Sequence, residues 1–388
     1  MSSKHMDQSA LTEPIVIDPP LEERQQSDNA ASAGWREASI PVEQVIERTK
    51  EWVRIQAEQF PGFLGAHLMG GITPMALSDP FPTYRDVDLH IILQDDSDIP
   101  GENAEVLYKG LMIEAGFRQQ KDYRTPEVVL ADPVIASHMA VPSILSDPTG
   151  FLTQLHKVVS REYARRKWVQ ARCEAEKREA LGKLETISHI PDPDSVTAYE
   201  LLGYTSTYVA AVFSLASLKA ITGRRSYIQM RHILERLGRA DLYERLCKVV
   251  GIRQVSRAEA KRYLQDAAEA FDLAVKVKRS PHPFGHKMYA HLRPYLVGGS
   301  QEMIDEGYYL EAMGWTMAFY GNSMQIIQTD APSQLTSKMQ AKFDECMSQF
   351  VLDQAVPWKT RLEEAKATFC EAFLLADEII ACNPAIFD

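Results

Sequence analysis

The spacing of apolar residues changes at about residue 150, and this change limits the possible folds more than any other feature of the sequence. Up to that point, short apolar runs of strand length are separated by loops. After Asp147-Pro148-Thr149-Gly150, long amphipathic segments with helical spacing dominate. They cover residues 151–186, 196–221, 226–249, 256–278, 300–328, 333–350 and 358–381. We therefore expect an α/β (α+β) domain over residues 35–150, followed by an all-helical domain over residues 151–388.

Within residues 35–150, the apolar pattern predicts a small mixed sheet with a few helices. A helix is expected to begin near Pro41, because proline is tolerated in the first helical turn. Strands are expected over residues 63–69, 87–93 and 111–117, and residues 102–110 fit a short helix. The 388 residues, 45% of them hydrophobic, are enough to bury two cores.

The amino-acid composition and net charge limit the kinds of molecule that the chain is expected to bind. Residues 1–34 are rich in Ser, Gln, Asp, Glu and Pro, which predicts a disordered tail. The formal net charge of −11 opposes binding to nucleic acid and suits metal ions and cationic small molecules. We therefore expect no nucleic-acid partner.

Cysteine spacing and hydropathy indicate a cytoplasmic protein with no membrane partner. The five cysteines lie far apart and form no CxxC pair, so neither a disulfide framework nor a zinc knuckle is expected. No apolar run reaches the ~18 residues that a membrane-spanning helix needs. The N-terminal residues have no hydrophobic core of the secretory type.

The most informative motif is Arg85-Asp86-Val87-Asp88-Leu89, which follows Leu68-Met69-Gly70-Gly71 after a loop with several prolines. Side chains alternate along a strand, so the two aspartates share one face. Such close carboxylates repel each other unless a cation lies between them, and oxygen ligands suit Mg²⁺. The paired glycines let the backbone approach a phosphate closely. This combination is typical of nucleotide chemistry.

A third carboxylate is expected at Glu114, which lies in the middle of the apolar strand 111–117. A lone carboxylate in such a strand is costly unless it is paired or bound to a metal. Three carboxylates on two strands could hold two Mg²⁺ ions at a phosphoryl displacement. Glu127 and Asp132 are the alternatives for the third ligand.

The order of apolar-Gly-Gly, loop, Asp-x-Asp and a later carboxylate resembles the nucleotidyltransferase superfamily, which includes DNA polymerase β and the aminoglycoside nucleotidyltransferases. The resemblance covers about residues 60–150. It implies Asp86, Asp88 and Glu114 as catalytic metal ligands and Gly70, Gly71 and Thr73 as the phosphate cradle. The sequence departs from the usual motif in three places, one of which is the long loop from Ile72 to Arg85 with its three prolines. Gly71 stands where serine is common, so Thr73 would have to supply the hydroxyl, and Glu114 stands where aspartate is common.

The resemblance implies transfer of a nucleoside monophosphate from an NTP such as ATP to a hydroxyl group, with release of pyrophosphate. A small hydroxylated and cationic acceptor, such as an aminoglycoside, agrees with the acidic chain and would indicate antibiotic resistance. Possible ammonium partners are Glu302, Asp305, Glu306 and Glu311. One of the basic residues between 157 and 172 could contact the triphosphate.

Two other functions are compatible with the same motif. One is a nucleotidyltransferase of a biosynthetic pathway with another small acceptor. The other is a catalytically weak protein that binds nucleotides and acts in regulation. Because all three carboxylates are present, the enzyme is the favoured hypothesis.

Overall fold

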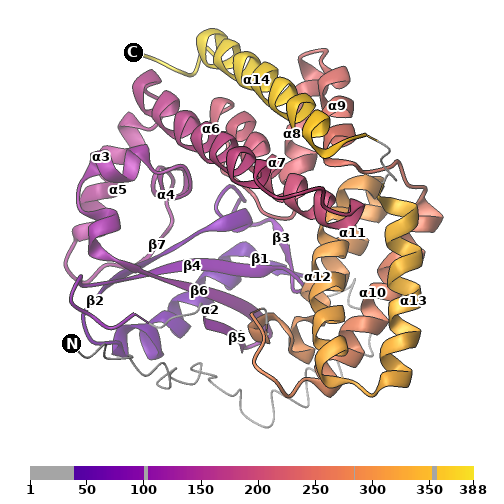
Figure 1. Ribbon diagram of the computed structural model, residues 1–388. Helices are drawn as coiled ribbons and strands as arrows, with labels where there is room; N and C mark the ends of the chain where they lie inside the picture. Colours follow the sequence, from indigo (N-terminus) through magenta and orange to yellow (C-terminus); the bar gives the residue numbers. More distant parts are fainter. Residues whose placement is uncertain (1–38, 100–103, 284, 352–355) are drawn as a thin grey trace, which may run out of the picture.

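The computed structural model describes residues 39–99, 104–283, 285–351 and 356–388 (Figure 1). It shows an α+β protein with a small sheet and many helices. The tail predicted over residues 1–34 lies outside the described residues. None of the described helices is long and apolar enough to cross a membrane.

The central sheet has five strands in the order β5-β6-β4-β2-β7. Strands β4 and β6 are parallel and the other neighbours are antiparallel, which confirms the prediction of a mixed sheet. The strands are β2 (Phe63–Leu68), β4 (Asp86–Leu93), β5 (Ala104–Tyr108), β6 (Leu111–Gln119) and β7 (Ile144–Ser146). A separate two-stranded ribbon joins β1 (Ser39–Pro41) to β3 (Pro80–Pro82).

The helix predicted over residues 102–110 is wrong, because the described part of this segment forms strand β5. Residues 104–108 pair with β6 as a hairpin, with Tyr108 opposite Leu111. Both turn residues, Lys109 and Gly110, have positive φ angles of 47° and 77°. Two such residues form the tight turn that matches the twist of antiparallel strands. A lysine tolerates this conformation poorly, so Lys-Gly gives a weaker hairpin signal than Asn-Gly.

Each face of the sheet packs against different helices (Figure 1). In β4, Val87, Leu89 and Ile91 belong to the same apolar core as residues of α2 (Val42–Ile55). On the opposite face, Ile92 belongs to the core that includes residues of α3 (Pro126–Ala131), α4 (Ile135–Met139) and α5 (Phe151–Glu162). Asp86 and Asp88 share this second face by strand alternation.

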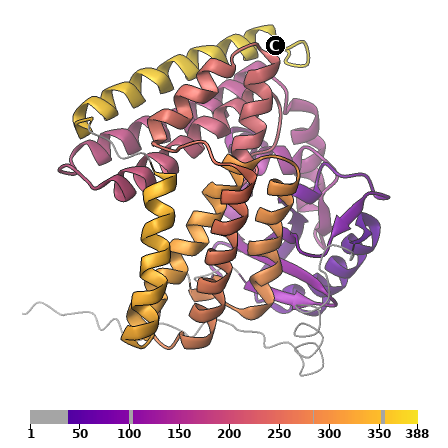
Figure 2. The same ribbon diagram turned by 90° about the vertical axis from the view of Figure 1, so that its right-hand side faces the viewer.

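From residue 151 onward, the named elements of the described chain are all helical (Figure 2). Three predicted segments are each split into two helices, and the others match single helices. The helices after α5 are α6 (Arg166–Ser188), α7 (Ser195–Ala216), α8 (Ser226–Arg236), α9 (Ala240–Val250), α10 (Arg257–Val277), α11 (Gly299–Asp305), α12 (Tyr309–Asp330), α13 (Ser333–Phe350) and α14 (Trp358–Cys382). Short helical turns η4 (Gly285–Lys287), η5 (Ala290–Leu292) and η6 (Pro294–Gly298) link α10 to α11.

A candidate metal centre where the sheet meets the helices

Strands β4 and β6 bring three carboxylates together. Asp88 lies directly opposite Glu114 in the parallel register, and Asp86 lies two residues earlier on the same face of β4. One carboxylate oxygen from each of the three residues lies within 4.8 Å of the other two. Across the described ranges, this is the one group of three or more His, Cys, Asp or Glu residues with such spacing. The structure thus assembles the trio that the sequence predicts.

A fourth carboxylate extends this row across the sheet. Glu105 of β5 lies directly opposite Glu114 in the antiparallel register, so the two side chains share one face. Its side chain is only 6% exposed. The sequence prediction missed Glu105, because a helix over residues 102–110 would not place it beside Glu114.

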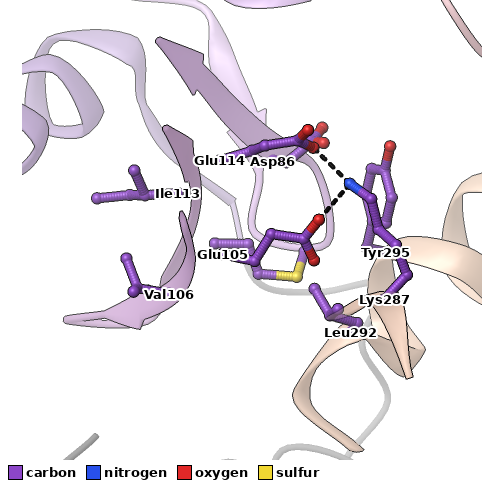
Figure 3. Close-up of a pocket in the computed structure, with 9 residues that line it drawn as sticks. Asp86, Glu105, Val106, Ile113, Glu114, Lys287, Leu292 and Tyr295 are labelled. Atoms are coloured by element: carbon purple, nitrogen blue, oxygen red, sulfur yellow. Dashed lines mark hydrogen bonds and ion pairs between the residues drawn. The ribbon is translucent and has the colours of Figure 1, made fainter. Parts of the chain in front are cut away.

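The cation nearest to these groups comes from the helical part of the chain. The ammonium of Lys287 in η4 donates a hydrogen bond to Oε2 of Glu114 at 2.7 Å and forms an ion pair with Glu105. Figure 3 shows the ammonium between the two carboxylates. About a quarter (27%) of the Lys287 side chain is exposed. No pattern in the sequence connects this lysine with carboxylates about 170 residues earlier.

A second cation, Arg224, lies close enough to act electrostatically on Asp86 and Asp88. Its guanidinium carbon lies 4.3 Å from the ring centre of Tyr295 and 5.2 Å from that of Trp315. Gly299 leaves room for it, because a Cβ there would lie 1.4 Å from the Nη1 atom. The Nε atom is buried and makes no hydrogen bond within the described residues. The two rings and Gly299 therefore hold the guanidinium of Arg224 in one position.

Burial is the largest influence on the pKa values of Asp86, Asp88 and Glu105. Burial raises the pKa of Asp86, although the nearby charge of Arg224 and a hydrogen bond with Tyr295 act to lower it. Burial, together with the charges of Asp86 and Glu114, raises the pKa of Asp88 well above its usual value. Burial also raises the pKa of Glu105 to about 7. The cluster is therefore short of positive charge, as expected of a site that accepts a cation.

The donor set fits a hard divalent cation. Carboxylate oxygens are the ligands that Mg²⁺ prefers, at roughly 2.1 Å, so two ligand oxygens on one ion lie at most about 4.2 Å apart. The spacing of 4.8 Å or less among Asp86, Asp88 and Glu114 needs only small side-chain adjustments to reach this value. The pocket beside them has a volume of only ≈ 10 Å³, enough for a water molecule or an ion. Its lining includes Leu292 and Tyr295 from the segment that carries Lys287.

The Gly-Gly turn lies directly against the second aspartate. The N–H of Met69 donates to the carbonyl of Asp88 at 2.7 Å, and Gly70 follows with a φ of 65°. A Cβ on Gly70 would lie 1.9 Å from Oδ2 of Asp88, whereas a Cβ on Gly71 would meet no atom within 4 Å. The hydroxyl of Thr73 forms hydrogen bonds with the carbonyl of Gly70 at 3.0 Å and with Nδ1 of His138 at 3.1 Å. The turn thus has open space only beside Gly71.

The two alternatives for the third ligand lie outside the carboxylate trio. Glu127 is exposed in the first turn of α3. Asp132 accepts hydrogen bonds from the N–H groups of Val134 and Ile135 at 2.8 and 2.6 Å, so it caps the start of α4. The geometry therefore favours Glu114 over both.

Several basic side chains between residues 157 and 172 contact groups away from the carboxylate trio. Arg172 is buried and donates to the carbonyls of Leu130 and Tyr163, both at 2.8 Å. Arg166 forms an ion pair with Asp388, and Arg165 forms one with Glu162. The cations that act on Asp86 and Asp88 are instead Lys287 and Arg224.

The acidic residues considered as partners of a cationic acceptor form ion pairs within the chain. Glu311 is buried and accepts hydrogen bonds from Arg231 and Tyr243. Glu302 pairs with Arg85, the residue before Asp86, at 2.7 Å. The remaining two pairs are Glu306 with Arg225 and Asp305 with Arg257. These four carboxylates therefore stabilise the helical part and its contact with the sheet.

Comparison with known proteins adds little to this geometry. No family model matches the chain, and no curated protein matches its sequence. A solved structure of a nucleotidyltransferase-like protein from Exiguobacterium sibiricum 255-15 is similar over 86% of this chain and 92% of that chain. The identity is 12% and the TM-score is 0.28, which is too low to support a conclusion on fold or function.

Proposed function

We propose that this protein is a metal-dependent nucleotidyltransferase that transfers a nucleoside monophosphate from an NTP to a hydroxyl group of a small molecule and releases pyrophosphate. The observation that carries the proposal is the trio of Asp86, Asp88 and Glu114 on two adjacent parallel strands. The Gly70-Gly71 turn against Asp88 supports it, because a phosphate cradle beside clustered carboxylates is what a metal-bound NTP requires.

Asp86 and Asp88 would hold Mg²⁺, which when bound neutralises phosphate charge and orients the triphosphate for in-line displacement. Glu114 would orient the acceptor hydroxyl and accept its proton. The sequence predicts a second ion at Glu114, but Lys287 already contacts that carboxylate. Most of the rate would come from positioning and charge neutralisation by these side chains.

The triphosphate would lie along the Gly70-Gly71 turn, where the space beside Gly71 is open. The Thr73 hydroxyl holds the turn through the Gly70 carbonyl, so its contribution would be to the shape of the cradle. The charge of Arg224, which acts on Asp86 and Asp88, would offset the negative charge that develops on the phosphates.

For the acceptor, we propose a small hydroxylated molecule and keep the aminoglycoside class as the first candidate. The net charge of −11 favours a cationic acceptor over an anionic one. The internal ion pairs of Glu302 and Glu311 mean that these two carboxylates do not add to that preference. A neutral acceptor from a biosynthetic pathway is the alternative.

The space beside Gly71 gives a direct test of the cradle. Gly71→Val should raise the KM for NTP by about tenfold or more, because the branched side chain fills the space that the phosphates need. Thr73→Ala should raise the KM for NTP less. Melting temperature and the KM for the acceptor should remain close to wild type in both variants. Unchanged NTP affinity of Gly71→Val in calorimetry would mean that the pair of glycines forms only a turn.

The third carboxylate is tested by comparing Glu114 with Glu127. Glu114→Gln should lower kcat by at least ~10²-fold, the usual loss when one electrostatic group of an active site is removed. Glu127→Gln removes the same charge from an exposed helix start and should leave kcat unchanged. Steady-state rates of pyrophosphate release measure both, and the reverse order of effects would reject Glu114 as the third ligand.

The reaction itself is tested by incubating the protein with each NTP and Mg²⁺ against a panel of hydroxylated compounds while pyrophosphate is measured. We expect release that depends on both Mg²⁺ and one class of acceptor. A polycationic acceptor should show a KM that rises several-fold with ionic strength, because salt screens its attraction to the protein. Release with a neutral sugar and none with any aminoglycoside would favour the biosynthetic alternative. No release with any pair of NTP and acceptor would argue against the proposal.

A further inference from the structure

We propose that Lys287 takes the place of a second divalent cation, so that the site holds one metal ion and one fixed ammonium group. This inference rests on the proposed function and refines it, because the expected arrangement of three carboxylates would otherwise hold two ions. It follows from the position, the surroundings and the charge of Lys287.

The ammonium of Lys287 lies where a cation shared by two carboxylates would lie. Its Nζ lies 2.7 Å from Oε2 of Glu114 and also contacts Glu105, the residue opposite Glu114 on the neighbouring strand. Asp88 lies on the other side of Glu114 in the same row. The four carboxylates therefore form two neighbouring places for a cation. Lys287 fills the one between Glu105 and Glu114 (Figure 3). The other lies between Glu114 and the two aspartates.

The surroundings hold the ammonium in this place. Lys287 belongs to a short helical turn, and Leu292 and Tyr295 of the following turns line the same small pocket. The two carboxylates that hold the ammonium are themselves largely buried, because the side chain of Glu105 is 6% exposed and that of Glu114 is 21% exposed. This geometry keeps the ammonium between the two groups.

The charges of the site match one divalent ion. Asp86, Asp88, Glu105 and Glu114 contribute four formal negative charges, while Lys287 and Arg224 contribute two formal positive charges. The remaining charge of minus two is neutralised by a single divalent cation, and a second would leave an excess of positive charge in a buried place. Glu114 can serve both cations, because a carboxylate has two oxygens that can each accept.

Lys287 would therefore be a positioning residue for Glu114. Its hydrogen bond fixes the carboxylate that faces the acceptor hydroxyl, and its charge takes over the neutralising role of the second ion. An ammonium does not lower the pKa of a hydroxyl as a bound metal does, so proton removal would depend on the carboxylate itself.

The number of bound ions tests this directly. We would titrate the full chain with Mn²⁺ alone and record its electron paramagnetic resonance, with Asp88→Asn as the background for ions bound elsewhere. Wild type should bind one Mn²⁺ above this background without spin coupling. Lys287→Met should bind two, and at the ~3.5–4 Å of a two-metal site their spins couple. Lys287→Arg keeps the charge and should bind one.

Lys109→Met is the matched control. Lys109 lies in the turn of the same β5–β6 hairpin and pairs with Glu51, so the substitution removes an equal charge without touching the four carboxylates. It should bind one ion, as wild type does. If Lys287→Met fails to fold by circular dichroism, Lys287→Gln keeps a hydrogen-bond donor and should likewise bind a coupled pair.

Different results would contradict the role of Lys287 and the proposed function. A coupled pair in wild type, or a single ion in every folded Lys287 variant, would overturn the role of Lys287 and leave the proposed function intact. No Mn²⁺ above background in wild type or in the Lys287 variants would instead contradict the metal site on which the proposed function depends.

Discussion

Asp86→Asn and Asp88→Asn are each expected to lower nucleotidyl transfer by at least ~10³-fold and, at the same time, to raise the thermal stability of the metal-free protein. The loss of activity follows because asparagine keeps the shape of the side chain but removes the charge that holds the metal. The gain in stability follows because these half-buried carboxylates are costly to ionise when no cation is bound.

The sign of the stability effect depends on pH. The pKa of both aspartates is raised in the folded protein, so the folded state disfavours their ionised form. Ionisation therefore destabilises the metal-free wild type as pH rises, and below the ordinary value of 3.8 the two states are equally protonated. The melting temperature of each asparagine variant should exceed that of wild type at pH 8, and the difference should shrink as pH falls towards 4.

Thermal unfolding in the presence of a chelator, together with pyrophosphate release, measures both effects. Asp96→Asn is the control, because Asp96 is exposed in the loop after β4 and its substitution should change neither quantity. Near-normal turnover in either active-site variant would reject the metal-ligand assignment. A lower melting temperature at pH 8 would show that Arg224 and Lys287 already outweigh the cost of burying the two ionised aspartates.

The second large effect is expected from Gly70→Ala, which should lower activity by ~10²-fold or more and destabilise the fold. Its φ of 65° is a conformation that a residue with a Cβ adopts at a cost of about 1–2 kcal/mol. The added Cβ would also lie 1.9 Å from Oδ2 of Asp88, so the carboxylate must move out of the trio. A displaced ligand weakens the site as severely as a missing one.

Substitutions at two other glycines distinguish displacement of the Asp88 carboxylate from general destabilisation of the fold. Gly110 has a similar φ of 77°, but a Cβ there would meet no atom within 4 Å, so Gly110→Ala should cost stability and leave activity unchanged. Gly71→Ala adds a Cβ in open space and should cost little stability. If Gly110→Ala lowered kcat as much as Gly70→Ala does, the activity loss would reflect general destabilisation. Circular dichroism and steady-state kinetics on the three variants decide this.

Local patterns in the sequence were enough to predict the trio of carboxylates. Alternation along residues 86–93 places Asp86 and Asp88 on one face, and the acidic residue within the apolar strand 111–117 marks Glu114. Both signals depend on side-chain periodicity within one strand. The parallel pairing of β4 with β6 then follows from the fold and brings the three together.

The rest of the site depends on contacts that local patterns do not encode. Lys287 and Arg224 reach the carboxylates from the helical part, through turns that carry no periodic signal. Glu105 was missed because its strand contains residues that also fit a helix, and only pairing with β6 decides between the two. The ion pair of Glu311 with Arg231 likewise forms only when α8 and α12 pack together, so the sequence pattern does not predict it.

The most direct measurement follows the two ends of the triphosphate. The protein would be incubated with Mg²⁺ and NTP labelled at either the α or the γ phosphorus, with and without a pool of hydroxylated small molecules. Nucleotidyl transfer predicts that the α label moves to the acceptor, or to nucleoside monophosphate when water reacts, while the γ label leaves in pyrophosphate. Both products should disappear in Asp88→Asn. Release of the γ label as inorganic phosphate, its transfer to an acceptor, or equal pyrophosphate release by Asp88→Asn would contradict the proposed reaction.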